Sequence, residues 1–250
     1  MKTDEREQDI IGILENRGEM TVVELSRILD ISVSTLRKQL SKMQSKNLII
    51  RTYGGVMSVN RAPDEAFDTK LHKMVPEKNQ IAAFARTLIE SGSSISLGSG
   101  STIYCLCNQL DDIGNATIYT NSMQAAEYLS RCTSLDVHIC GGIIRSKTGT
   151  IIGNETTQYF KHHHADYAFI SCDAIDASGN VYSDNIAVGT AEQAVIKNAK
   201  RKYILSDSTK FGKSSVAQII NLNECDGLIT NNSSDTIANI FESITKVYYA

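Results

Sequence analysis

Segments with a helical pattern of apolar residues alternate with short apolar runs over residues 77 to 250 of this 250-residue chain. Such alternation predicts a mainly parallel β-sheet covered by helices, because parallel strands need a crossover between them, usually a helix. The helical patterns cover residues 81–89, 103–110, 123–130 and 191–199. The apolar runs cover residues 94–97, 117–120, 137–140, 168–172, 203–206 and 227–230. The expected fold class of this part is α/β.

The first 60 residues have a different organisation. Ile10, Ile11 and Leu14 form the apolar side of a helix predicted over residues 4–16. Thr21 and Glu24 are spaced as a capping box, which predicts the start of a short helix over residues 22–29. A tight turn at residues 30 and 31 ends that helix. The sequence therefore predicts a helix-turn-helix arrangement.

Ser32 can cap the second helix of the pair. The apolar residues of this helix recur at helical spacing and predict its buried side: Val33, Leu36, Leu40 and Met43. The opposite side is polar and basic: Ser34, Arg37, Lys38, Ser41 and Lys42. Residues 47–59 predict two short strands around Gly54 and Gly55, whose freedom to take a positive φ suits a tight hairpin. Three helices and a hairpin are typical of a winged helix-turn-helix, whose second paired helix enters the major groove of DNA.

Charge indicates a nucleic-acid partner for this part of the chain. Residues 31 to 61 contain six Lys or Arg and no Asp or Glu, although the formal net charge of the whole chain is −3. An ordinary solvated face usually mixes both signs, whereas duplex DNA is bound through its phosphates by local positive charge. We expect Arg37 to contact guanine and Gln39 adenine, and Lys42, Lys46 and Arg51 to contact phosphate. The residues expected at the DNA are Ser32, Ser34, Thr35, Arg37, Lys38, Gln39, Lys42, Lys46, Arg51, Tyr53, Gly54 and Gly55.

A linker between two domains is expected at residues 61–76. This interval contains both prolines of the chain, Pro63 and Pro76, and little apolar periodicity. The expected division is 1–60 for the winged helix-turn-helix, 61–76 for the linker and 77–250 for the α/β domain. The charge follows this division, with a formal charge of +2 over residues 1–61 and −5 over residues 62–250.

Small, hydroxylated and glycine residues follow several of the predicted strands. The segments are G-S-G-S-T at 98–102, T-N-S at 120–122, C-G-G at 140–142 and S-D-S-T-K-F-G at 206–212. Because open α/β sheets bind ligands at the carboxyl ends of their strands, these segments predict one binding site. Gly98 and Gly100 allow close approach of the backbone, and residues 99–102, with Lys210 and Arg145 as candidate cations, suit an anion such as phosphate. The alternative is that each loop is only a connection and each cation a surface charge.

Two stretches of the chain resemble the DeoR family of bacterial transcription regulators. S-V-S-T-L-R-K-Q-L at residues 32–40 is similar to the family's V-S-x-x-T-I-R-R-D-L, and R-T-Y-G-G at residues 51–55 is similar to R-T-H-G-G. The chain departs from this pattern at Lys38, at Gln39, where Asp is typical, and at Tyr53, where His is usual. These departures affect which operator sequence is recognised more than whether DNA is bound.

The resemblance covers nearly the whole chain and implies a sensor domain similar to ribose-5-phosphate isomerase and glucosamine-6-phosphate deaminase. G-S-G-S-T, T-N-S, G-G-x-x-R and S-T-K-F-G match the sugar-phosphate loops of that domain, so a phosphorylated sugar is the implied effector. The family often has Asp at the position of Gly98 and Gly at that of Ala174, which implies a different recognition of hydroxyl groups here. The residues expected at the effector are Gly98, Ser99, Gly100, Ser101, Thr102, Thr120, Asn121, Ser122, Gly141, Gly142, Arg145, Asp173, Lys197 and Lys210.

Catalysis is the alternative use of such a domain. Asp173, Asp176, Glu192 and Lys197 are candidates, since an aldose–ketose isomerase moves a proton with a carboxylate. At residues 166–176, however, the related isomerases would have a D-G-A-D-E run, and Ile170 stands in the place of its first carboxylate. We therefore expect a binding pocket without catalytic residues or cofactor. Asp173 would bond sugar hydroxyls and Lys197 would pair with a carboxylate or the ligand, unless both are simply solvated.

Other features bear on metal, redox and membrane roles. Three adjacent histidines at 162–164 point about 100° apart on a helix, so no shared metal site is expected. The six cysteines include no C-x-x-C pair, which favours reduced, structural thiols. No apolar run approaches the roughly 20 residues that span a bilayer, and the first residues have no signal-peptide core, so we expect a cytoplasmic protein without a membrane partner.

Together these patterns predict a DNA-binding transcription regulator, a repressor of a carbohydrate operon controlled by a phosphorylated sugar. Two winged helices held at a fixed spacing match a repeated operator, so a dimer or tetramer is expected. Two alternatives stay open. One is a sugar-phosphate isomerase or deaminase with an accessory DNA-binding head, and the other is a constitutive architectural DNA binder.

Overall fold

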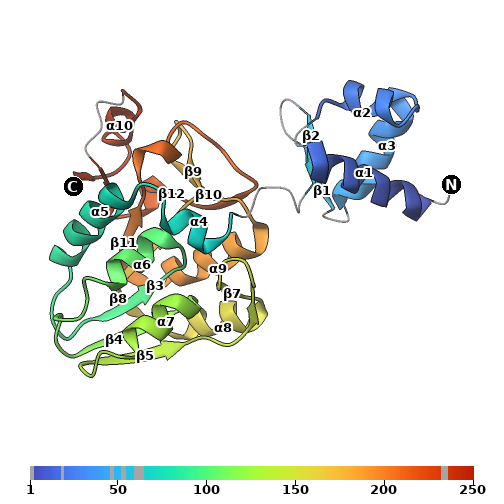
Figure 1. The fold of residues 1–250 in the computed structure, drawn as a ribbon. Coiled ribbons are helices and arrows are strands. Elements are labelled where there is room, and N and C mark those ends of the chain that lie inside the picture. Colours follow the sequence, from blue (N-terminus) through green and yellow to red (C-terminus); the bar gives the residue numbers. More distant parts are fainter. Residues whose placement is uncertain (1–2, 18–19, 46–47, 52–54, 59–64, 232–235) are drawn as a thin grey trace. The chain divides into compact units, whose positions relative to one another are not determined.

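The computed structural model describes residues 3–17, 20–45, 48–51, 55–58, 65–231 and 236–250 (Figure 1). The chain forms two compact units, Met1–Asp64 and Glu65–Ala250. The end of the interval expected as a linker lies in the second unit, where it forms α4 (Phe67–Leu71) and the start of α5 (Val75–Thr87). Phe67 is the buried residue of α4, which is too short to show a periodic pattern.

The first unit has the expected order of three helices and a hairpin. The helices are α1 (Thr3–Arg17), α2 (Val22–Ile28) and α3 (Val33–Ser45), and the antiparallel strands are β1 (Ile49–Arg51) and β2 (Val56–Ser58). Both predicted caps are present. The Thr21 hydroxyl accepts a hydrogen bond from the Glu24 N–H at 3.2 Å, and the Ser32 hydroxyl accepts one from the Thr35 N–H at 3.2 Å.

The core of this unit lies between α1, the inner side of α3 and the hairpin. Leu36, Leu40 and Met43 are fully buried, as predicted, and pack with Leu14 and Val56. Gly55 has no positive φ, contrary to expectation, and is required for another reason. A Cβ atom on it would collide with the backbone carbonyl of Met20, which pairs with Val56.

The second unit is built on a seven-stranded sheet with the order β14-β13-β11-β8-β3-β4-β5. All neighbouring strands are parallel, as the alternation predicts. The strands are β3 (Ser94–Leu97), β4 (Ala116–Thr120), β5 (Leu135–Ile139), β8 (Ala165–Ser171), β11 (Ala199–Leu205), β13 (Gly227–Thr230) and β14 (Val247–Tyr249).

Helices cover both faces of the sheet (Figure 1). On one face α5, α6 (Ser101–Cys107) and α7 (Met123–Leu129) share one core with Phe169 of β8. On the other face α8 (Asn154–His162), α9 (Ile186–Lys197) and α10 (Thr236–Phe241) share one core with Ala168 and Ile170 of the same strand. Because successive residues of a strand point to opposite faces, one apolar strand supplies both cores.

Several short elements have no counterpart among the sequence predictions. A hairpin is formed by β6 (Ile143–Ile144) and β7 (Ile151–Ile152), and β9 (Ala174–Ile175), β10 (Asn180–Ser183) and β12 (Ala217–Asn221) form a small antiparallel sheet. Strands of two to five residues contain too few alternations for a pattern to be recognised. The hairpin and the small sheet lie in connections that follow β5, β8 and β11.

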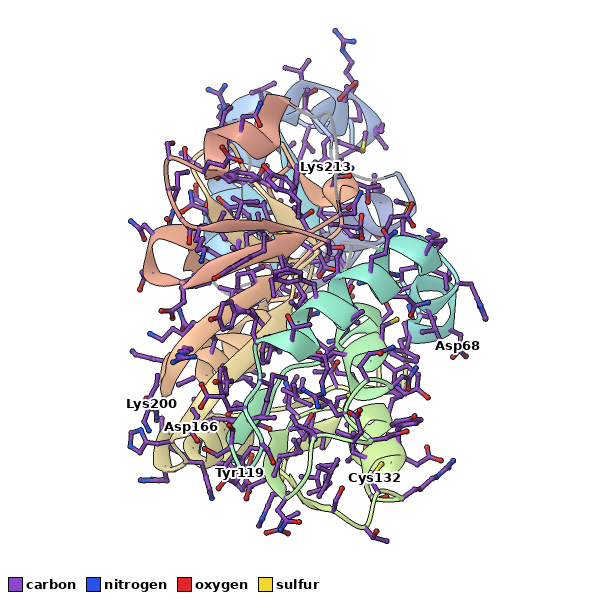
Figure 2. The ribbon with its side chains drawn as sticks, turned by 90° about the vertical axis from the view of Figure 1, so that its left-hand side faces the viewer. Asp68, Tyr119, Cys132, Asp166, Lys200 and Lys213 are labelled. Atoms are coloured by element: carbon purple, nitrogen blue, oxygen red, sulfur yellow. The ribbon has the colours of Figure 1, made fainter. Side chains whose placement is uncertain are left out.

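An ion pair marks the amino-end edge of the large sheet. Asp166 in β8 and Lys200 in β11 point toward each other in Figure 2, with 2.8 Å between the carboxylate and the ammonium. Both residues lie at the beginning of their strands, where Ala165 pairs with Ala199. This edge is opposite to the edge at which ligands bind in open α/β sheets.

The six cysteines all have free thiols. Among the residues that the structure describes, no helix is long and apolar enough to cross a membrane. Within the same residues, no three His, Cys, Asp or Glu side chains are arranged to hold a metal ion. The three histidines diverge at the end of α8, where His163 stacks on Tyr159 while His162 and His164 are exposed.

Candidate functional site

Polar residues gather at the carboxyl ends of four adjacent strands. In the sheet order β11-β8-β3-β4, the loops that follow these strands are neighbours. Many of their polar residues are buried: Ser99, Ser101, Thr102, Thr120, Asn121, Ser122, Ser206 and Asp207. Burial of so many hydroxyl and amide groups is costly unless they bond one another or a ligand. This edge is the candidate effector site.

Glu192 of α9 reaches into this site from the helix layer. One carboxylate oxygen, Oε1, accepts hydrogen bonds from the Ser99 N–H at 2.9 Å, the Ser99 hydroxyl at 2.7 Å and the Asn121 amide at 3.3 Å. The side chain is 2% exposed, and this burial raises the pKa of Glu192 to about 7, although the three donors act in the opposite direction. The Ser99 amide that the sequence assigns to an anion therefore already binds a carboxyl group of the protein.

The absence of a side chain at Gly98 makes this arrangement possible. A Cβ atom there would lie closer to Oε2 of Glu192 than any real Cβ contact, and would also press on Ile170. The resemblance to DeoR regulators implies Asp at this position. In this chain a carboxylate is present at the same place, but it comes from α9 rather than from the loop after β3.

Several polar atoms at the site have no partner among the described residues. Oε2 of Glu192 and Oδ1 of Asn121 are buried acceptors without a donor. The hydroxyls of Ser101 and Thr102 make no recorded hydrogen bond in that part of the chain, although both residues are buried. Buried polar groups normally have partners, so these atoms are available to a bound molecule or to water.

Asp173, which follows β8, forms an ion pair that the sequence analysis did not anticipate. Its Oδ1 accepts a hydrogen bond from the Lys70 ammonium of α4 at 2.6 Å. Its Oδ2 accepts hydrogen bonds from the Asp184 N–H at 2.9 Å and the Ser183 hydroxyl at 3.3 Å. Burial alone would raise the pKa of Asp173, but the charge of Lys70 and these hydrogen bonds lower it overall. Both carboxylate oxygens of Asp173 thus have donors within the protein. Its direct role is to position Lys70, not to bond a sugar hydroxyl.

Two further lysines approach the same place. Lys78 of α5 is buried and donates to the backbone carbonyl of Lys70, and burial lowers the pKa of its ammonium. Lys210, predicted as an anion ligand, is half-buried and acts electrostatically on Lys78 and on Asp173. No hydrogen bond of the Lys210 ammonium is recorded within the described ranges. Sequence reasoning missed Lys70 and Lys78 because they precede the first strand of the sheet.

The C-G-G segment lies at the rim of the site. Gly141 and Gly142 are exposed, and the Gly141 carbonyl accepts a hydrogen bond from the Thr156 hydroxyl at 2.8 Å. Arg145 is half-buried, and its backbone N–H donates to the carbonyl of Thr150, just before β7, at 2.9 Å. That hairpin is attached to the T-N-S segment, since Ile151 donates its N–H to the Asn121 carbonyl at 2.7 Å.

Lys197 is not brought together with the other predicted residues. It is exposed in the last turn of α9, two residues before β11 begins at Ala199. It therefore lies toward the amino-end edge of the sheet, while Glu192, five residues earlier, reaches the carboxyl-end edge. Asp176 is also excluded from the site, because its carboxylate accepts bonds from Ser178, Asn180 and Tyr182 within its own turn.

The second candidate interface is the exposed side of α3 in the first unit. Most of the residues expected at the DNA are exposed: Ser32, Ser34, Thr35, Arg37, Lys38, Lys42 and Arg51. The side chain of Arg51 in β1 donates to the backbone carbonyl of Arg37 at 2.9 Å, and so joins the hairpin to α3. Gly55 is half-buried, and the expectations for Lys46, Tyr53 and Gly54 fall outside the described residues.

Gln39 differs from the other residues predicted on this side. It is half-buried, and its amide nitrogen is buried without a partner among the described residues. Position 39 follows the buried Leu36 by three residues, which brings it toward the inner side of α3. The nitrogen that would be needed to pair with adenine therefore does not lie on the exposed side.

Comparisons with known proteins match both parts of the chain. Residues 6–62 match the DeoR-like helix-turn-helix domain, and residues 73–232 match the DeoR C terminal sensor domain. The chain is 29% identical over 230 residues to the L-fucose operon activator of Haemophilus influenzae, covering 91% of this chain and 92% of the relative. It is 28% identical to the glycerol-3-phosphate regulon repressor of the same organism, covering 96% and 93%.

Among solved structures, ribose 5-phosphate isomerase A from Methanocaldococcus jannaschii is similar at 18% identity and a TM-score of 0.41, covering 54% of this chain and 53% of that one. The sensor-domain match alone spans more than half of the chain, and the helix-turn-helix match accounts for most of what precedes it. The protein is a member of the DeoR family of transcription regulators.

Proposed function

We propose that this protein is a repressor of a carbohydrate operon. A phosphorylated sugar changes its affinity for the operator DNA, in either direction. The observation that supports this most is the pairing of a basic, exposed α3 face with a sensor domain that has a polar, partly unsatisfied site. Relatives of the same family include an activator of fucose genes and a repressor of glycerol-3-phosphate genes.

On the DNA, Arg37, Lys38 and Ser34 of α3 contact base edges, and Lys42 contacts phosphate. These contacts are supported by the exposure of all four side chains, whereas Leu36, Leu40 and Met43 of the same helix are buried. Arg51 has a bridging role between hairpin and helix in addition to its charge. Two or four copies of the chain bind a repeated operator, because paired helices at a fixed spacing match paired half-sites.

In the sensor domain, Lys78 and Lys210 bind the phosphate group together with the hydroxyls of Ser101 and Thr102. Among the described residues the two hydroxyls have no partner, and the ammonium of Lys78 donates to the carbonyl oxygen of Lys70. Lys70 lies beside them, held by Asp173. A dianionic phosphate favours such a set of donors over neutral sugars.

The domain binds its ligand without converting it. Its relatives are regulators, and Asp173, the carboxylate in register with an isomerase motif, is occupied by Lys70, Ser183 and Asp184. Turnover assays on pentose and hexosamine phosphates check this point. Conversion that disappears in Asp173→Asn would instead identify an isomerase or deaminase.

The central experiment is a gel-shift titration of the full chain on its own upstream DNA, with and without a panel of sugar phosphates. A coupling of about 1–3 kcal/mol between the two ligands changes the DNA affinity roughly 5- to 150-fold. Thermal shift provides the matching test of binding, because a ligand at 100 times its Kd adds about 2.7 kcal/mol of stability. Retention of DNA with no response to any sugar phosphate, in either measurement, would contradict the sensor half of the proposal.

A further inference from the structure

The effector site contains a buried carboxyl group whose hydrogen-bonding capacity is only partly used. Glu192 is 2% exposed, yet only Oε1 has donors, namely the amide and hydroxyl of Ser99 and the amide of Asn121. Oε2 has none among the described residues, and neither has Oδ1 of Asn121. Glu192 and Asn121 are thus joined by one hydrogen bond, and each also has a buried oxygen that accepts none.

The charge of this carboxyl group is uncompensated as well. Besides burial, Asp173, after β8, is the ionisable group that raises the pKa of Glu192, and Glu192 in turn raises that of the Cys140 thiol, after β5. Neither is a cation, and no ion pair of Glu192 is recorded among the residues that the structure describes. A buried carboxylate is normally paired with a cation, and removal of such a partner is strongly unfavourable.

The lysines of the site are placed elsewhere. Lys70 is paired with Asp173, and the charged groups that act on Lys78 include Asp207, Lys210 and Lys70. The site thus has a cationic part, suited to phosphate, and a separate anionic part at Glu192 and Asn121. A ligand that matches both parts has a phosphate at one end and a positively charged hydrogen-bond donor at the other.

We propose that Glu192 is a specificity-determining residue of the effector site and that it selects a phosphorylated ligand with an ammonium group, of the amino-sugar phosphate class. The inference rests on the proposed sensor function and deepens it. An ammonium offers three N–H donors, enough for Oε2 of Glu192 and Oδ1 of Asn121 together, and it supplies the missing charge. A hydroxyl offers one donor and no charge.

Binding of an ammonium fixes Glu192 in its ionised form. Because burial raises the pKa of Glu192 to about 7, part of the free protein is protonated at neutral pH, and that proton is released when the ammonium binds. A ligand with a hydroxyl in the same place leaves the proton in position. Proton release is therefore a signature of contact with Glu192 that a purely structural role of this residue would not produce.

The test is isothermal titration of the full chain at pH 7 with matched pairs: glucosamine 6-phosphate against glucose 6-phosphate, and galactosamine 6-phosphate against galactose 6-phosphate. Ribose 5-phosphate and inorganic phosphate complete the series, and buffers of different ionisation enthalpy report the protons released. We expect one amino sugar phosphate to bind at least about tenfold more tightly than its hydroxyl counterpart, a difference of about 1.4 kcal/mol, with release of protons.

Two variants separate specificity from folding. Glu192→Gln should reduce the tenfold preference to near unity and abolish proton release, and a cooperative urea unfolding transition shows that the variant is folded. Glu155→Gln, an exposed position on α8, should change none of these values. If sugar phosphates bind without a preference for the amine, or without proton release in the wild type, this inference is wrong while the sensor function stands. If no sugar phosphate of the series binds at all, both are wrong.

Discussion

Gly98 and Glu192 form a complementary pair, in which the carboxyl group of one residue occupies the space that the side chain of the other lacks. The departure from the family pattern at Gly98 thus has a physical reason. An Asp at this position would clash with Glu192 and would add a second carboxylate to a site that already contains an unpaired one. The two positions are therefore expected to change together or not at all.

The first prediction concerns Gly98→Ala. The added methyl group would overlap Oε2 of Glu192 and press on Ile170, so we expect a loss of about 1–3 kcal/mol in the free energy of unfolding. Urea denaturation of the full chain, followed at the sensor unit, measures it. Gly141→Ala is the matched control, because no atom lies within 4 Å of its added Cβ. Equal stability of the two variants would show that Glu192 moves away at no cost.

The second prediction is a pH dependence that Glu192 imposes on stability. Its pKa is about 7 in the folded protein, against an ordinary value of 4.5, because it is buried. Between these values the folded state binds a proton that the unfolded state has lost, so stability falls as pH rises through this window and is level above it. The total effect is at most about 3 kcal/mol. Glu192→Gln should flatten the profile between pH 5 and 8, and an unchanged slope would exclude Glu192 as its source.

A third prediction compares two Lys–Asp pairs that differ in exposure. The ammonium of Lys70 lies 2.6 Å from Asp173 with both side chains about four-fifths buried, whereas Lys200 is 78% exposed in its pair with Asp166. Double-mutant cycles with Lys70→Met and Asp173→Asn should give a coupling of about 1–3 kcal/mol. The cycle at Lys200 and Asp166 should give less than about 1 kcal/mol. Similar couplings would mean that burial does not strengthen the inner pair.

A fourth prediction tests Lys42 as a phosphate contact. Lys42→Ala should weaken binding to all DNA sequences and reduce the slope of log affinity against log salt by about one unit, because one fewer counterion is released. Fluorescence anisotropy over a range of salt concentrations measures the slope. Lys161→Ala removes the same charge from an exposed helix of the sensor unit and should leave the slope unchanged. An unchanged slope for Lys42→Ala would place this lysine away from the DNA backbone.

A fifth prediction tests Arg37 as a base contact. Its side chain is exposed on α3, where a guanidinium can bond guanine through two donors. Arg37→Ala should cost about 1–3 kcal/mol on the operator and relax the preference at one base pair. Binding to a library of operator variants measures this. A uniform loss across the library would reclassify Arg37 as a phosphate contact.

The DNA-binding unit illustrates what a sequence determines by local rules. Thr21 with Glu24, and Ser32 with Thr35, are three residues apart, and the spacing alone fixes their hydrogen bonds. Helical periodicity predicts the buried side of α3, and the residues outside this apolar stripe are the ones predicted to be exposed. Gln39 is the exception, because it is predicted on the exposed side although its amide nitrogen is buried.

The parallel sheet was also determined by the sequence, since alternating strands and helices have few other ways to pack. That alternation placed Ser99, Ser101, Thr102 and Asn121 at one edge, and the structure brings them together there. The elements that complete the site depended instead on tertiary packing. Lys70 comes from a helix of five residues, too short for any periodic signal, and meets Asp173 more than a hundred positions later in the chain.

Glu192 shows most clearly what the sequence pattern alone does not determine. In the sequence it is one acid in an apolar helix, equal in pattern to Lys197 five residues later. Only the direction of α9 across the sheet decides that Glu192 reaches Ser99 while Lys197 remains exposed near the start of β11. Local sequence sets which residues are helical or extended, because those preferences act over a few positions. Which distant side chains meet, and with what charge and burial, is a property of the folded chain alone.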